Sequence, residues 1–317
     1  MWFLMALSSA ILLGFYDVQK KQSLRHNAVI PVLFLNTLFS TLIMLPAIVG
    51  SRAGLIDDGS HWFVPLYDWH VHLFIVLKAA IVLSSWVCGY FAIKHLPLTI
   101  VGPINATRPV LTLMGACLIL GERLNGWQWG GVLVALIAFM MLSRSGKREG
   151  IDFAHNRWIA LLVAAALFGA VSGLYDKYLL SPELDGGRGL SAMFVQAWFN
   201  VYQMIMMALA FVLWQRQAVR CLHTRGTVVD SDFHFEWRWS IPCISLFLCA
   251  ADMCYFYALS FSGALIAVVS MTRRSSVLVS FLFGAFVLHE RSIGSKAIDL
   301  LLVFVSILLL TIGTLAV

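Results

Sequence analysis

Two arginines, Arg108 and Arg274, each lie inside a long run of mostly apolar residues. The segments around them align with a constant offset of 166 residues: one contains Cys88-Gly89-Tyr90-Phe91-Ala92-Ile93 and the other Cys254-Tyr255-Phe256-Tyr257-Ala258-Leu259. Arginine in hydrocarbon is costly, so each arginine needs a partner or a water-filled cavity. The planar guanidinium suits a carboxylate or a phosphate. The pattern predicts a duplicated membrane protein with anion-binding cations near its centre.

The apolar segments hold four cations and a single acid near their middle, namely Lys78, Arg108, Arg273, Arg274 and Asp252. This excess of positive charge favours an anionic ligand. We expect Arg108 and Arg274 to hold the anion, while Lys78 adds positive potential. Arg273 points about 100° away from Arg274 on a helix, so it can reach a neighbouring helix instead. Asp252 either restrains a cation when the cavity is empty or forms a structural ion pair.

Amides and hydroxyls accompany these charges at helical spacing. Asn105 lies one turn from Arg108, and Ser270 lies one turn from Arg274. Further stripes run along two other apolar segments, with Asn36 and Ser40 on one and Gln196, Asn200 and Gln203 on the other. We expect hydrogen bonds to a solute from Asn36, Asn105, Gln196 and Asn200. The alternative is that such side chains only join helices to one another.

Two aspartates occupy equivalent places late in their segments, each beside lysines. Asp17 is followed by Lys20 and Lys21, and Asp176 by Lys177. Gate or proton-relay roles are one interpretation of Asp17, Asp176 and Asp252, and ion pairs with the nearby lysines at the membrane edge are the other. Lys78 also has a second interpretation, because it could snorkel to the interface if its helix started late.

Composition determines the class of protein that must position these residues. The chain has 317 residues, of which 60% are hydrophobic and only 12% charged, and its mean hydropathy is +0.86. A soluble domain could not cover so much apolar surface, so the chain is predicted to be an all-α integral membrane protein. A span needs about 20 residues. Ten segments qualify, at about 2–20, 29–50, 73–93, 97–120, 128–144, 158–180, 191–214, 241–260, 263–288 and 297–316.

Several kinds of chemistry are not indicated. The six cysteines and nine histidines show no metal-ligand spacing, and no segment resembles a phosphate-binding P-loop. No catalytic constellation is present, so we expect neither an enzyme nor a metal or other cofactor. The net charge of +6 resides largely in loops that can meet anionic lipid headgroups, so we expect membrane lipids and a small solute as partners and no nucleic acid.

The repeat extends through the whole chain. Gly14-Phe15-Tyr16-Asp17 matches Gly173-Leu174-Tyr175-Asp176, and Gly121-Glu122-Arg123 matches His289-Glu290-Arg291. We therefore expect two five-helix units, residues 1–150 and 151–317. Because five is an odd number, the second unit must be inverted relative to the first. Inverted repeats are typical of transporters, which bind their substrate near the midplane between the repeats.

This layout, together with the turn Gly121-Glu122-Arg123-Leu124 and its echo in the second half, resembles the EamA-type branch of the drug/metabolite transporter superfamily. The resemblance implies a ten-helix transporter but does not specify a substrate. The pair Arg273-Arg274 also resembles the Lys-Arg pair that holds phosphate in plastid sugar-phosphate translocators, although Asn105 stands where those proteins would have a lysine.

We therefore expect a secondary transporter that moves a small anionic or zwitterionic metabolite, bearing a carboxylate or phosphate, by alternating access. Two alternatives stay open: a proton-coupled exporter of cationic or amphipathic compounds, and a carrier of polyprenyl-phosphate glycolipids. The expected location is a bacterial inner membrane. Loop charges favour termini outside the cell, the resemblance favours termini inside, and the oligomeric state is open, a monomer included.

Overall fold

Helices make up nearly all of the described chain. The structure is a computed structural model, and it describes residues 2–108, 110–111, 125–148, 155–180, 187–225, 234–260, 273, 276–287 and 293–315. Within these ranges no strand occurs. The helices are α1 (Trp2–Leu24), α2 (Val29–Arg52), α3 (Trp69–His95), α4 (Leu98–Ala106), α6 (Gly126–Arg148), α7 (Arg157–Leu180), α8 (Ala192–Arg225), α9 (Ser240–Ser260), α11 (Ser276–Phe286) and α12 (Ile293–Leu315).

These helices overlap all ten expected segments, although their ends differ from the prediction. The third expected segment began at residue 73, but α3 begins at Trp69. The seventh ended at residue 214, whereas α8 continues to Arg225, because residues 215–225 contain neither glycine nor proline to interrupt it. Among the described residues, four helices are long and apolar enough to span a membrane: Val29–Arg52, Trp69–His95, Arg157–Leu180 and Ala192–Val219. The prediction of an all-helical membrane protein is confirmed.

Local sequence sets several helix boundaries. Pro97 follows the end of α3 and lies immediately before α4, where its fixed φ is compatible with a helix start and its missing N–H is not needed. Asn156 precedes α7, and its Oδ1 accepts a hydrogen bond from the Trp158 N–H at 2.9 Å, which is the geometry of an N-cap.

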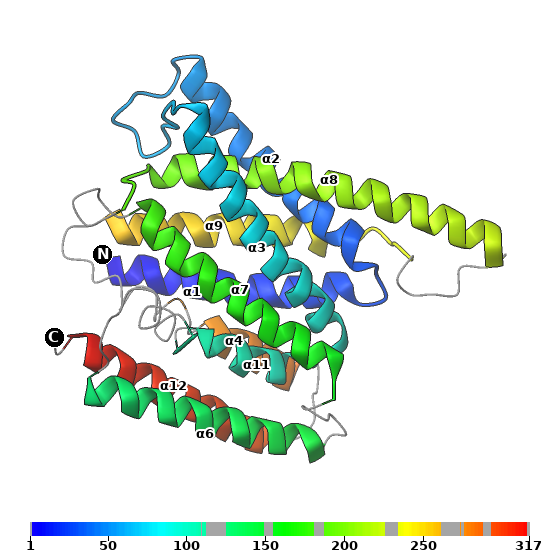
Figure 1. Cartoon of the computed structure of the whole chain (residues 1–317), viewed down its shortest axis with the longest axis vertical. Coiled ribbons are helices and arrows are strands. Elements are labelled where there is room, and N and C mark those ends of the chain that lie inside the picture. Colours follow the sequence, from blue (N-terminus) through cyan, green and yellow to red (C-terminus); the bar gives the residue numbers. More distant parts are fainter. Residues whose placement is uncertain are drawn as a thin grey trace.

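The main helix contacts join the first half of the chain to the second. α1 packs against α9 and α11, and α7 packs against α3 and α4 (Figure 1). α2 contacts α8 and α9, α8 also contacts α3, α4 contacts α11, and α6 lies along α12. This set of pairs is unchanged if α1, α2, α3, α4 and α6 are exchanged with α7, α8, α9, α11 and α12, but α4 also contacts α12, and the described residues give no comparable contact of α11 with α6. The division into units 1–150 and 151–317, and their inversion, stay predictions.

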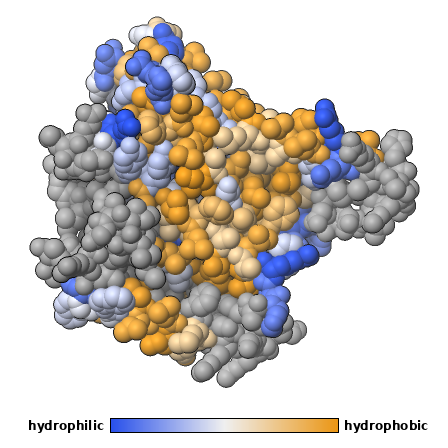
Figure 2. Space-filling view, in the orientation of Figure 1, coloured by the Kyte–Doolittle hydropathy of each residue, from blue (hydrophilic) through white to orange (hydrophobic). Residues whose placement is uncertain are grey.

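The surface has the apolar flank that a bilayer requires. Figure 2 shows apolar residues over the middle of one face, with hydrophilic residues toward its upper end and its right side. Large apolar side chains are exposed along α6 and α12, among them Leu133, Leu136, Met140, Leu301 and Leu308. A contiguous apolar surface of this kind fits contact with lipid.

One polar joint ties the turn between α1 and α2 to the segment before α9. The buried amide of Asn27 donates to the backbone carbonyls of Ser23 at 3.0 Å and Glu236 at 2.9 Å. Its Oδ1 accepts from the Glu236 N–H at 2.6 Å, and the Ala28 N–H donates to the His234 carbonyl at 2.8 Å. The joint satisfies backbone groups that burial would otherwise leave unpaired.

Candidate functional site

Polar side chains gather inside the bundle where α2, α8 and α9 meet. Asn36 on α2 is fully buried, and its amide donates to the Tyr90 hydroxyl of α3 at 3.1 Å. The Ser245 hydroxyl of α9 lies 2.9 Å from both the backbone carbonyl and the Oδ1 of Asn36. Asn36 therefore joins three helices, which is the structural alternative considered for it.

Asp252 holds Arg273 a little further along α9. The two side chains form an ion pair, with 13% and 19% of their surfaces exposed. Gln196 of α8 donates to the other carboxylate oxygen of Asp252 at 3.5 Å, and the guanidinium carbon of Arg273 lies 4.4 Å from the centre of the Tyr255 ring. The structure thus brings together three predicted site residues and pairs the central acid with an arginine.

Two buried amides on α8 have side-chain atoms without a hydrogen-bond partner. Among the described residues, Asn200 Nδ2 and both amide atoms of Gln203 have no hydrogen-bond partner. The backbone carbonyl of Asn200 accepts a hydrogen bond from the Thr41 hydroxyl at 3.0 Å, which joins α8 to α2 at this position.

Lys78 and Asp176 form an ion pair between α3 and α7. The Lys78 side chain is only 6% exposed, whereas that of Asp176 is 37% exposed, and the ammonium lies 5.1 Å from the centre of the Phe199 ring. Because α3 begins at Trp69, Lys78 is well inside the helix. The structure therefore favours the buried position of Lys78 over a snorkelling one.

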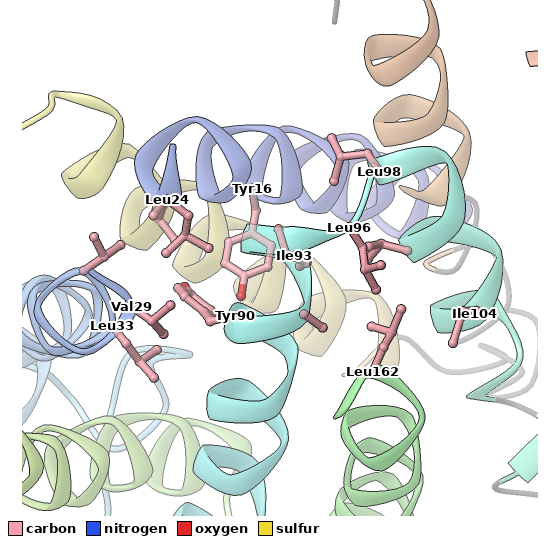
Figure 3. Close-up of a cluster of buried hydrophobic side chains, with 14 of the residues drawn as sticks. Tyr16, Leu24, Val29, Leu33, Tyr90, Ile93, Leu96, Leu98, Ile104 and Leu162 are labelled. Carbon is pink, nitrogen blue, oxygen red and sulfur yellow. The ribbon is translucent and has the colours of Figure 1, made fainter. Parts of the chain in front are cut away.

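A second charged cluster lies near the end of α1. Lys20 is buried and pairs with Asp17 at 3.0 Å, and its ammonium lies 4.3 Å from the centre of the Tyr16 ring. Tyr16 hydrogen-bonds Tyr90, and Figure 3 shows these two rings together among buried apolar side chains. Asp17 also lies close enough to stabilise the charge of Arg108.

Arg108 rests on the backbone of α7. A Cβ atom built on Gly169 would lie 2.8 Å from the guanidinium carbon of Arg108, so only a glycine leaves room for the arginine. On the same side of the site, Asn105 Oδ1 is buried and has no hydrogen-bond partner within the described ranges. Arg274 and Ser270 lie outside the described residues.

Asp252 is not the sole acid beside the predicted cations. Asp176 pairs with Lys78, and Asp17 lies near Arg108, so the described structure sets three carboxylates beside Lys20, Lys78, Arg108 and Arg273. In the sequence both aspartates lie near helix ends. The sequence did not predict that α7 packs on α3 or that Asp17 lies near Arg108. In the part of the chain that is described, no group of three His, Cys, Asp or Glu side chains could hold a metal ion.

Several contributing residues were not predicted as part of the site. Gly169 gave no signal in the sequence beyond its place on an apolar helix, and Ser245 was one of many serines. Gln203 was visible as the last member of the polar stripe on α8. The repeat did single out Tyr16, because it matches Tyr175.

The apolar helices and the paired charges between them define a helical membrane protein. Residues 1–144 of the chain match the model of the EamA-like transporter family. It is 31% identical over 146 residues to a protein of Rhizobium johnstonii (strain DSM 114642 / LMG 32736 / 3841) named riboflavin transporter. That match covers 46% of this chain and 43% of the relative, so it spans less than half of either protein.

A solved crystal structure is similar in fold over nearly the whole length. It covers 98% of this chain and 97% of its own, with a TM-score of 0.58 and 16% sequence identity. At this identity the likeness concerns the fold alone. The resemblance drawn from the sequence motifs is confirmed by the family match.

Proposed function

We propose that this protein is a secondary transporter in which two inverted five-helix repeats, residues 1–150 and 151–317, alternate in opening a central solute site to either side of the membrane. The pairing of helices supports this, because the contacts between the two halves stay the same when the halves are exchanged, apart from the contact of α4 with α12. A structure built in this way can rock one unit against the other around a fixed central site.

The observation that carries the proposal is the contact of Arg273, Asp252 and Gln196 inside the bundle. A buried arginine must remain paired, because an uncompensated charge there costs about 3–5 kcal/mol. In the empty transporter Asp252 is its partner. The anionic group of a solute replaces Asp252 at the guanidinium, and Gln196 then keeps a hydrogen bond to the displaced carboxylate.

The substrate that fits this exchange is a small anionic or zwitterionic organic metabolite with a carboxylate or phosphate group. A zwitterion suits the site because its cationic group can meet the carboxylate that the arginine releases. Arg108 and Arg274 are the further cations of the proposed site, and the pairs Lys78–Asp176 and Lys20–Asp17 are its proposed gates.

The experiment is solute uptake into proteoliposomes that contain wild-type protein, Arg273→Ala, Arg108→Ala or the control Arg52→Ala. Arg52 is an exposed arginine at the end of α2, so its loss changes net charge equally without touching the interior. The panel contains carboxylates, sugar phosphates and nucleotides beside cationic drugs. We expect uptake of one anion class, at least tenfold lower in Arg273→Ala and Arg108→Ala. Normal uptake in both variants would refute the anion site.

A second candidate substrate is a flavin, which the name of the Rhizobium relative favours. Riboflavin is uncharged, whereas FMN carries the same ring and a phosphate. Uptake of FMN alone would support the anion site, and equal uptake of riboflavin would show that the phosphate is not needed.

The same panel, together with thermal unfolding in the presence of lipid phosphates, tests the two other functions that the sequence left open. Uptake of cationic drugs alone, abolished in Asp252→Asn, would indicate a proton-coupled exporter. Stabilisation by lipid phosphates alone would indicate a lipid-linked carrier, for which the apolar groove between α2 and α9, lined by Phe39, Leu42, Ile43, Pro242, Cys243 and Leu246, offers a lateral surface.

A further inference from the structure

Gln203 is an uncharged polar side chain enclosed in the bundle with neither end of its amide used. Gln203 is 0% exposed, and neither its Oε1 nor its Nε2 has a hydrogen-bond partner within the described chain. Asn200, one turn earlier on the same helix, is 2% exposed and leaves its Nδ2 unpaired in the same way. An unsatisfied buried group of this kind costs about 1–3 kcal/mol.

The position of these amides relates them to the charged part of the site. Gln196, Asn200 and Gln203 are spaced by four and three residues, so they share one face of α8. Gln196 reaches Asp252 at one end of this face. All three residues are buried, so this face points into the bundle, and the Asn200 backbone carbonyl accepts a hydrogen bond from Thr41 of α2.

A comparison with Asn36 argues against a purely structural role for Gln203. Asn36 is an equally buried amide on the neighbouring helix, and both of its amide atoms have partners on other helices. Amides that join helices are expected to be paired in this way. Gln203 joins nothing in the described structure, although its burial is as complete.

We propose that Asn200 and Gln203 bind an uncharged amide or imide edge of the transported solute. The Gln203 Oε1 accepts from an N–H of this edge, while its Nε2 and the Asn200 Nδ2 donate to carbonyl oxygens. The inference rests on the proposed transport function and adds a neutral recognition element beside the arginines. It makes Gln203 a specificity-determining residue, because a site with buried polar groups rejects analogues that leave them unpaired.

Riboflavin is a suitable probe, since its ring has an imide N–H between two carbonyls, and 3-methylriboflavin lacks that N–H. Binding of both is measured by flavin fluorescence on purified wild-type protein, Gln203→Leu and the control Ser306→Ala. Ser306 is a fully buried polar residue on α12 whose hydroxyl donates to the Gly131 carbonyl of α6 at 2.7 Å. The unfolding temperature of each ligand-free protein is measured in parallel.

We expect Gln203→Leu to weaken riboflavin binding at least tenfold and to bind the methylated compound equally weakly. Wild-type protein and Ser306→Ala should both discriminate between the two flavins. Ligand-free Gln203→Leu should unfold at or above the wild-type temperature, because it loses an unpaired group, whereas Ser306→Ala should unfold below it.

Equal riboflavin affinities of wild-type protein and Gln203→Leu would overturn the inference, as would equal affinities of wild-type protein for the two flavins. Failure of the wild-type protein to bind riboflavin, together with normal anion uptake by Gln203→Leu, would also overturn it but leave the transport proposal intact. Absence of uptake of every solute in the panel would remove the transport proposal itself.

Discussion

Gly14 of α1 and its repeat counterpart Gly173 of α7 have opposite surroundings, and this difference gives a matched pair of variants. A Cβ on Gly14 would lie 2.4 Å from the Val279 Cβ and 3.0 Å from the Ser276 carbonyl oxygen of α11. A Cβ on Gly173 would meet nothing within 4 Å. We therefore compare Gly14→Ala with Gly173→Ala.

The two substitutions differ only in the steric contact that the added methyl group makes with α11. Alanine in place of glycine within a helix gains about 0.5–1 kcal/mol from the lower entropy of the unfolded chain, and this gain is common to both. Overpacking costs about 1–3 kcal/mol. The blocking atoms at Gly14 are a Cβ and a backbone oxygen, neither of which is the end of a flexible side chain, so the upper part of this range applies. Gly14→Ala should be about 2–3 kcal/mol less stable than Gly173→Ala.

The assay is thermal unfolding of the two purified, ligand-free variants in the same detergent, with wild-type protein alongside. A chain of this size shifts by roughly 2 °C per kcal/mol, so the variants should differ by roughly 4–6 °C. Gly173→Ala should unfold at or slightly above the wild-type temperature. Coincident transitions of the two variants would refute the close packing of α1 on α11.

Two further substitutions test other parts of the structure. Gly169→Ala should lower solute uptake severalfold with little change in unfolding temperature, because the added methyl displaces only the flexible end of Arg108. Uptake equal to that of Gly173→Ala would contradict a solute-binding role for Arg108. Asn27→Ala should lower the stability by about 2–3 kcal/mol, because it removes the three hydrogen bonds that this fully buried side chain makes with the backbone of Ser23 and Glu236, while uptake per folded molecule stays at the wild-type level. An unchanged unfolding temperature of this variant would contradict the joint.

The helices were predictable because length and apolarity alone determine where a span can lie. The ends of the helices were less predictable, because polar residues by themselves do not end a helix. The histidines at positions 70 and 72 suggested a loop, yet α3 already includes them. Likewise α8 continues through Arg216 and Gln217 beyond its apolar part.

The types of residue in the site were predictable, but their ion-pair and hydrogen-bond partners were less predictable. The sequence identified Asp252 as a restraint for a cation, and the structure pairs it with Arg273. It did not identify the partner of Lys78, because Asp176 lies on another helix of the opposite half and contact across halves depends on helix packing. Asn36 was expected to meet a solute, yet its amide is used within the protein.

The repeat-equivalent residues of α1 and α7 differ in a consistent direction. Gly14 is packed against α11 while Gly173 is open. Tyr16 is buried whereas Tyr175 is partly exposed, and the Asp17 side chain is 21% exposed against 37% for Asp176. Equivalent sequences in a symmetric fold should have equivalent surroundings unless the two halves adopt different arrangements. A transporter closed on the side of Asp17 and loosened on the side of Asp176 would have this difference, and the proposed alternation would reverse it, with α7 closing on α4 as α1 leaves α11.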